Sequence, residues 1–320
     1  MNTTIVRCLA VVFIANSHLE RLYPVPQLAA DGLLGNSLFF LLSGLGLELG
    51  ARARKGKSET FANWYGRRLA RIYPALWIVV VGFVVLGQGA WRTWGPADYA
   101  SALAWPTAYG FLAQIVPFYA IYYVLMRRRD GRVYVAGVAG LAVSYLLVAA
   151  FVYDLHVLSV LFHAQTMLLG GWLASRAESL GQTPKRDVAV LGLTLAAYIS
   201  IKLAMSLGRV PTHIAPLHLL AVPIVVCLVS LGNSARAIKS ILGRPWLARP
   251  VTLMATLTLE IYLVHGFVYE NPWVESLQFP LNLAAFWGLT VALAWLVGRA
   301  SHWDKAAARL RGVGVVVTQG

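Results

Sequence analysis

The chain alternates between long apolar runs and short segments that hold nearly all of its charge. A helix that crosses the hydrocarbon core of a bilayer needs about 20 mostly apolar residues. The pattern predicts ten such helices, at residues 3–19, 31–50, 73–90, 106–125, 133–153, 157–175, 187–206, 213–232, 251–270 and 280–299. Residues 91–105 are aromatic and partly polar, which is typical of a segment at the membrane interface. We therefore predict an all-α, polytopic transmembrane helical bundle.

The composition supports this fold class. Of the 320 residues, 58% are hydrophobic and only 12% are charged, yet the formal net charge is +14. A soluble domain carries about twice that charged fraction, so an ordinary soluble enzyme and a disordered chain are excluded. The basic residues punctuate apolar runs rather than forming one solvated face, so we expect no nucleic-acid partner. Cys8 and Cys227 both lie in apolar stretches, with no metal-site or disulfide spacing.

The basic residues also predict an orientation. With the N-terminus in the cytoplasm, 23 of the 27 Lys and Arg residues fall on the inner side, and the four outside are Arg21, Arg92, Lys202 and Arg209. This asymmetry follows the positive-inside rule and predicts that both termini are cytoplasmic. No basic residue precedes the first apolar run, so we expect a retained first helix rather than a cleaved signal. A single transmembrane domain is expected over 1–320.

Ionisable residues inside the apolar runs are candidates for function, because charge at membrane depth is costly. Arg7 and His18 lie about 16 Å apart along the first helix, which puts Arg7 near the cytoplasm and His18 in the outer half. A histidine beside a carboxylate can activate a hydroxyl group. Snorkelling of Arg7 and an interfacial His18 are the structural alternatives. The other candidates are Glu20, just past His18, Asp31 near the outer interface, and His265 towards the outer face, with Glu260 at mid-membrane and His163 about two turns deeper than His156.

The basic segment FANWYGRRLARIYPALW, at 61–77, carries Arg67, Arg68 and Arg71 just before the third apolar run. Guanidinium groups at a membrane mouth suit phosphate recognition, although a lipid-facing basic helix would look the same. The glycines of GLGLELG, at 44–50, favour close helix packing. The chain has no GxSxG, Walker A or HExxH motif.

Taken together, these stretches resemble the acyltransferase 3 family of integral membrane O-acyltransferases, which includes bacterial enzymes that O-acetylate O-antigen and exopolysaccharide. VRCLAVVFIANSH holds Arg7 and His18 at the family's spacing, and RRLARIYP is close to the family's basic block. GNSLFFLLSG (35–44) and LTLEIYLVHGFV (257–268) are similar to two further family segments, and MLLGGWLA (167–174) is a weaker match.

The chain departs from the family pattern at some positions. Ser37 stands where the family often has Asp, and we expect Asp31 or Glu20 to compensate. In the sixth predicted helix, His163, Ala164 and Gln165 stand where a glutamate often precedes the glycine. No SGNH hydrolase-like extension follows the last predicted span, so a stand-alone transmembrane form is expected.

The resemblance implies roles for the candidate residues. Arg7, Arg67, Arg68 and Arg71 would bind the phosphates of a cytoplasmic acyl-CoA, with acetyl-CoA as the expected donor. His18 would be the catalytic residue, acting as general base or as a transient acyl carrier. Its partner stays open among Glu20, Asp31, Glu260 and His265. Tyr73 and Trp64 would hold the CoA end, and Ser43 would line the pore. No metal is expected.

The sequence thus predicts a multi-pass protein of the bacterial inner membrane, in contact with membrane lipid. It would transfer an acyl group, with acetyl expected, from acyl-CoA to a hydroxyl of a surface or exported glycan or a lipid-linked saccharide. The alternative is a proton-coupled secondary transporter of small acids or acylated sugars, which an internal repeat would favour. A non-catalytic scaffold of a polysaccharide export complex would not require the costly Arg7–His18 pair. The acceptor, the acyl length and the oligomeric state are open.

Overall fold

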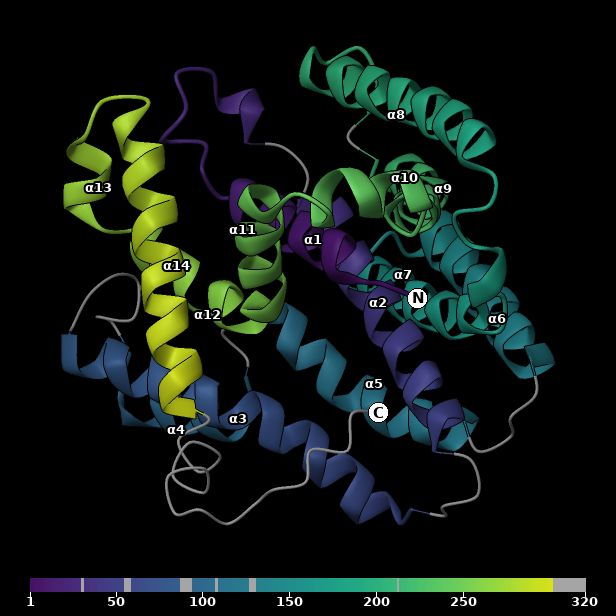
Figure 1. Ribbon diagram of the computed structural model, residues 1–320, viewed down its shortest axis with the longest axis horizontal. Coiled ribbons are helices and arrows are strands. Elements are labelled where there is room, and N and C mark those ends of the chain that lie inside the picture. Colours follow the sequence, from purple (N-terminus) through teal and green to yellow (C-terminus); the bar gives the residue numbers. More distant parts are fainter. Residues whose placement is uncertain are drawn as a thin grey trace. The chain divides into compact units, whose positions relative to one another are not determined.

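The computed structural model describes residues 1–29, 32–54, 59–86, 94–106, 109–126, 131–211 and 213–301 (Figure 1). Within these residues the regular elements are helices, and no strand is present. The predicted all-α bundle is confirmed. The described residues fall into two compact units, each of which combines segments from distant parts of the chain.

The first unit comprises Met1–Ile14, Asp31–Lys55 and Ile121–Thr256. Its long helix α2 packs along α7, and α9 packs against α2 and α8. Its elements are most of α1 (Thr4–Asn16), α2 (Gly32–Ala53), the end of α5 (Gly110–Met126), α6 (Gly131–Phe151), α7 (Leu155–Ala174), η3 (Ala177–Ser179), α8 (Pro184–Ser206), α9 (Ala215–Gly232), α10 (Ala235–Ala237), η4 (Ile238–Leu242) and α11 (Pro245–Thr256).

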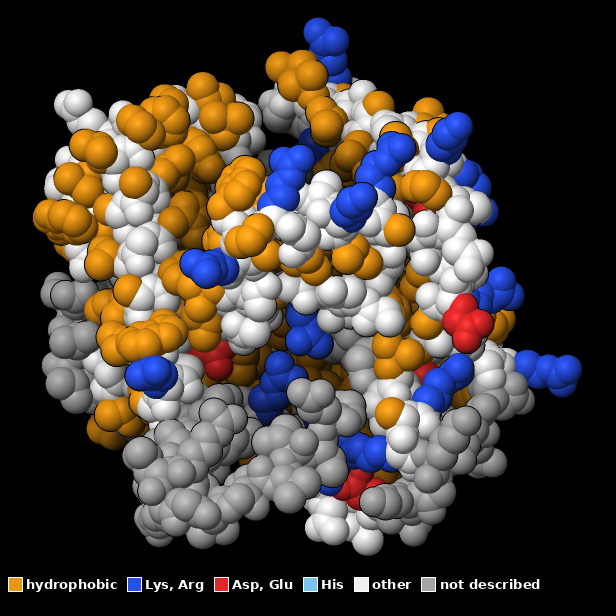
Figure 2. Space-filling model, viewed as in Figure 1, with side chains coloured by type: hydrophobic (Ala, Val, Ile, Leu, Met, Phe, Trp, Pro, Cys, Tyr) orange, Lys and Arg blue, Asp and Glu red, His pale blue; other side chains and the backbone are white. Residues whose placement is uncertain are grey.

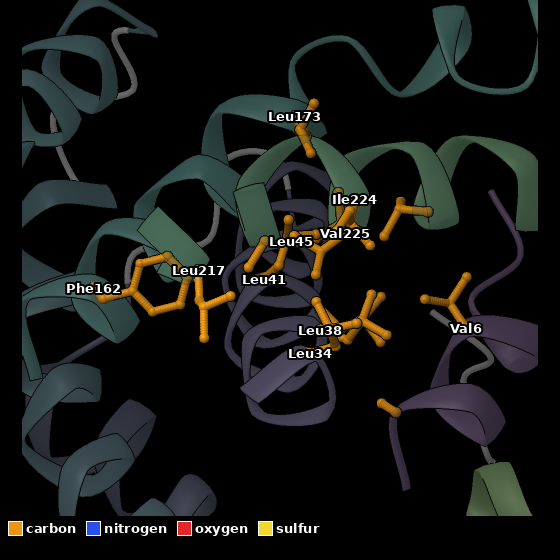
Figure 3. Packing of buried hydrophobic residues seen from close by; sticks show 14 of the residues in the cluster. Val6, Leu34, Leu38, Leu41, Leu45, Phe162, Leu173, Leu217, Ile224 and Val225 are labelled. Atoms are coloured by element: carbon orange, nitrogen blue, oxygen red, sulfur yellow. The ribbon is translucent and has the colours of Figure 1, made fainter. Parts of the chain in front are cut away.

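The core of the first unit forms around one stripe of α2 (Figure 3). Leu34, Leu38, Leu41 and Leu45 recur at three- or four-residue spacing, so they share one face of the helix. All four are buried, and they belong to the same apolar cluster as Ile224, Val225 and Phe162.

Glycines allow α2 and α7 to approach at backbone distance. A Cβ atom on Gly44 would collide with the Met167 carbonyl, and one on Gly170 would collide with the Leu41 carbonyl. Backbone atoms cannot swing aside as a flexible side chain can, so only glycine fits at these two positions. The close packing predicted for residues 44–50 is confirmed at Gly44, whereas Gly46 and Gly50 face open space.

The second unit comprises Ala15–Ala30, Gly56–Ala120 and Leu257–Gly320. Its helix α12 packs against α14 and α3. Its elements are η1 (Pro26–Leu28), α3 (Phe61–Leu86), α4 (Pro96–Ala104), the start of α5, α12 (Thr258–Tyr269), α13 (Pro272–Ser276) and α14 (Leu281–Ser301).

Six helices of the described residues are long and apolar enough to cross a membrane, and α11 with α12 would add a seventh. The six include α2, α6, α7, α8, α9 and α14, while α1 and α5 are shorter apolar helices. The count of ten spans therefore stays a prediction. Two of the predicted spans differ clearly from the helices that the structure forms. The span at 251–270 is interrupted at Leu257, whose backbone leaves the helical region, and α3 begins at Phe61 rather than at 73.

The surfaces of several helices are apolar, as lipid contact requires. Figure 2 shows hydrophobic side chains over α13 and α14 of the second unit, where Trp273, Leu281, Trp295 and Leu296 are exposed. In the first unit, α6 exposes Leu146 and other large apolar side chains. Exposed apolar surface on long helices is the expected property of a multi-pass membrane protein.

Candidate functional site

A short folded loop after α1 carries His18. The helix ends at Asn16 rather than at residue 19 as predicted, and His18 follows in a turn whose backbone N–H donates to the Ala15 carbonyl at 3.3 Å. The Asn16 side chain ties the two ends of this loop. Its amide donates to the Leu28 carbonyl at 2.9 Å, and its oxygen accepts from the Tyr23 hydroxyl at 2.6 Å.

Buried contacts fix this loop to α12, α13 and α14. Leu19 and Leu22 are buried in a cluster with Val268, Val274 and Phe286. The buried side chain of Asn282, on α14, donates a hydrogen bond of 2.7 Å to the Leu22 carbonyl. A buried backbone carbonyl without such a partner would cost stability, so Asn282 helps to fix the backbone that positions His18.

The His18 ring lies next to the His265 ring of α12. Their centroids are 5.1 Å apart and the ring planes are tilted by 43°. Nδ1 of the buried His265 lies 2.8 Å from the Tyr262 carbonyl oxygen, which can only accept a hydrogen bond. Nδ1 therefore carries the proton of the neutral ring, and Nε2 keeps a lone pair. A backbone carbonyl thus sets the tautomer of the histidine beside His18.

The surroundings of His18 favour its neutral form. The residue is exposed, yet burial of part of its imidazole by the surrounding protein lowers the pKa below its usual 6.5. The nearby Glu20 carboxylate partly opposes this effect by raising the pKa. A neutral imidazole near physiological pH is the form that can accept a proton.

Among the predicted partners of His18, His265 is the one whose ring the structure places beside it. Glu20 acts on His18 through its charge. Glu260 lies five residues before His265, so the two side chains point about 140° apart around α12. Its carboxyl end packs near Gly298 of α14 instead. Asp31 lies outside the described residues.

Other predicted site residues belong to the first unit. Arg7 is half-buried on α1 and Ser43 is half-buried on α2. The fully buried Ser37 hydroxyl donates to the Leu33 carbonyl of its own helix at 2.6 Å, so it is satisfied locally. His163 is buried on α7 and stacks on Phe40 with ring centroids 4.5 Å apart.

The arginines of α3 divide into two sets. The Arg68 guanidinium lies over the Trp64 ring at 5.1 Å, and Trp64 meets Tyr119 edge-on at 6.2 Å. Arg71 and Arg68 both lie within electrostatic range of Tyr119. Arg67 lies four residues before Arg71, on the same side of α3, and forms an ion pair with Glu59. The three arginines thus differ in their neighbours: Arg68 and Arg71 lie near Tyr119, whereas Arg67 is paired with an acidic residue.

The Tyr73 hydroxyl is used within the fold. It donates to the Ala104 carbonyl of α4 at 2.9 Å, and the ring packs edge-on against Trp77 at 5.6 Å. This bond ties α3 to α4.

An aromatic group beside His265 was not predicted as part of the site. The Tyr262 ring lies 5.8 Å from the His265 ring, and Tyr109 and Phe111 lie 5.8 Å and 5.5 Å from Tyr262. The only sequence signal was Tyr262 within the segment LTLEIYLVHGFV. Tyr109 and Phe111 come from an apolar run that gives no indication of its neighbours.

The second unit thus holds an imidazole pair, carboxylates and a basic aromatic face within a membrane-type helical fold, an arrangement that fits group transfer at a membrane. The acyltransferase domain of the acyltransferase 3 family matches residues 4–299, and the chain belongs to that family. The match runs through both compact units. No curated protein and no solved structure matches the chain significantly. The protein is therefore a multi-pass membrane acyltransferase.

Proposed function

We propose that this membrane acyltransferase moves an acyl group, acetyl in the first instance, from cytoplasmic acyl-CoA to a hydroxyl of a surface or exported glycan. The observation that carries the proposal is the His18–His265 pair, in which the Tyr262 carbonyl sets the tautomer of His265. Because CoA is cytosolic and the acceptor is exported, the proposed location is the bacterial inner membrane.

In the proposed reaction the neutral His18 accepts the proton of the acceptor hydroxyl. The hydroxyl oxygen forms a bond with the thioester carbonyl carbon, the carbon–sulfur bond breaks, and the CoA thiolate takes the proton from the His18 imidazolium. His265 holds the His18 ring in place, and its Nε2 lone pair is available to an N–H of His18. A transient acyl-His18 is the second route, and a labelled acyl-enzyme would reveal it.

Arg68 and Arg71 are the proposed phosphate-binding residues of the donor site. Their guanidinium groups suit bidentate contacts with phosphate oxygens, and Trp64 holds the Arg68 plane by a cation–π contact. Because Arg67 is already paired with Glu59, we assign it a smaller share of phosphate binding. The roles of Arg7 and Ser43, which belong to the first unit, stay predictions from the sequence.

Two measurements test the proposal. The first is acyl transfer from radiolabelled acetyl-CoA by purified protein in proteoliposomes. The second is the amount of base-labile acetyl ester on the surface glycan of cells that express the chain. We expect His18→Ala to lower the rate by about 10²–10⁴-fold, the usual contribution of a general base. The matched control is His156→Ala, because His156 is an exposed histidine of α7. Full activity of a well-folded His18→Ala protein would overturn the role of His18. If the wild type transfers no acetyl group from acetyl-CoA, the assignment of acetyl-CoA as the donor is overturned.

A further inference from the structure

Three aromatic side chains form a wall on one side of His265. Tyr262 lies next to the imidazole, with Tyr109 and Phe111 packed against the Tyr262 ring. Tyr109 and Phe111 are buried, whereas Tyr262 keeps part of its surface accessible. Tyr262 is therefore the member of this group that can meet a bound molecule.

A hydrogen bond to the backbone and the packing of the rings hold this wall in place. The Tyr109 hydroxyl donates to the Leu263 carbonyl at 3.0 Å, which joins the start of α5 to α12. The Phe111 backbone also lies close enough to act on the Tyr262 hydroxyl. The Tyr262 ring is thus held by α12, which carries it, and by the packed rings of Tyr109 and Phe111. The rings behind Tyr262 cannot move aside for a larger group without breaking the buried Tyr109–Leu263 hydrogen bond.

The position of the wall limits the group that can react at His18. Reacting atoms must come within about 3–3.5 Å of each other, so the acyl carbonyl must lie close to the imidazole pair. On one side of the His265 ring the space is filled by Tyr262 and the aromatic rings behind it. A methyl group beside the imidazole pair needs little room, whereas a longer chain that extends past His265 on this side would meet the Tyr262 ring.

We propose that Tyr262, supported by Tyr109 and Phe111, is the residue that restricts this protein to short acyl groups. The inference rests on the proposed transfer from acyl-CoA and specifies its donor class as acetyl or a similarly short acyl-CoA. Hydrophobic sites discriminate by about 10- to 200-fold per methylene group. Removing the ring should therefore change chain-length preference by a measurable factor.

The experiment measures kcat/KM for acetyl-, butyryl- and hexanoyl-CoA with the full-length protein in proteoliposomes. We expect Tyr262→Ala to raise the ratio of hexanoyl to acetyl transfer by about tenfold or more. Tyr262→Phe removes the hydroxyl but keeps the ring, so it should retain the preference for acetyl. Phe111→Leu provides a second, milder opening of the wall in case Tyr262→Ala does not fold.

A matched control separates the effect of the aromatic wall on chain-length preference from a general loosening of α12. Phe267 lies on the same helix, two residues beyond His265, and packs in the apolar cluster with Leu22 and Phe286. Phe267→Ala should leave the hexanoyl-to-acetyl ratio unchanged. If the wild type transfers acetyl and the ratio stays the same in folded Tyr262→Ala and Phe111→Leu proteins, the inference is overturned while the proposed function stands. If the wild type transfers no acyl group from CoA, the proposed function itself fails.

Discussion

The imidazole rings of His18 and His265 lie 5.1 Å apart, although the two residues come from opposite ends of the chain. The loop after α1 carries one ring and α12 carries the other, and both segments share a buried apolar cluster. This contact gives His18 a neighbour whose tautomer is set by the Tyr262 carbonyl. His265 is thereby a positioning residue for the proposed base.

Replacing His265 should slow the chemical step more than it weakens donor binding. His265→Ala removes the ring that packs on His18, and we expect kcat to fall by about 10- to 100-fold with little change in KM for acetyl-CoA. The measurement is the steady-state kcat and KM of His265→Ala, compared with those of His156→Ala. A rise in KM at constant kcat would assign His265 to binding instead.

The pH dependence of transfer should report the lowered pKa of His18. A general base works when it is neutral, so a pKa below 6.5 keeps the wild type active at mildly acidic pH. The rate should fall only as the pH drops through that lowered pKa. Glu20→Gln removes the carboxylate that raises this pKa, so the acidic limb of kcat/KM should move to still lower pH. A shift of the limb to higher pH in Glu20→Gln would contradict this electrostatic assignment.

The hydropathy pattern predicted the residue ranges of the helices that are continuous and apolar. The ranges expected for α2, α6, α9 and α14 agree with the structure within a few residues. The break at Leu257 was missed because the sequence around it stays apolar and contains no Gly or Pro at the break. The early start of α3 was missed because residues 61–72 are basic and aromatic, so they form a helix without forming an apolar run.

The site was predicted in part, since depth along a helix can be estimated from sequence. His18 and His265 were expected at a similar depth, and the structure brings their rings together. Contact also depends on the angle around each helix and on which helices are neighbours, and apolar patterning encodes neither. For this reason the sequence could not separate His265 from Glu260, which packs near Gly298.

The arginines of α3 should differ in their effect on donor binding. We expect Arg68→Gln and Arg71→Gln each to raise KM for acetyl-CoA by about tenfold, the equivalent of one charge-assisted hydrogen bond. Arg67→Gln should have a smaller effect because Arg67 is paired with Glu59. Arg68→Lys keeps the charge but loses the planar fork, so it should restore only part of the affinity. A larger effect at Arg67 than at Arg68 would reverse the assignment.

The close approach of α2 and α7 makes a stability prediction that is independent of the site. Gly170→Ala would drive a Cβ atom into the Leu41 carbonyl, and overpacking of this kind costs about 1–3 kcal/mol or more. The thermal unfolding midpoint of the purified protein should therefore fall. Gly46→Ala is the matched control, because Gly46 lies on α2 with open space around it. Alanine is the better helix former, so this variant should unfold at or slightly above the wild-type temperature. Equal unfolding temperatures for the two variants would show that α2 and α7 are not in backbone contact at Gly170.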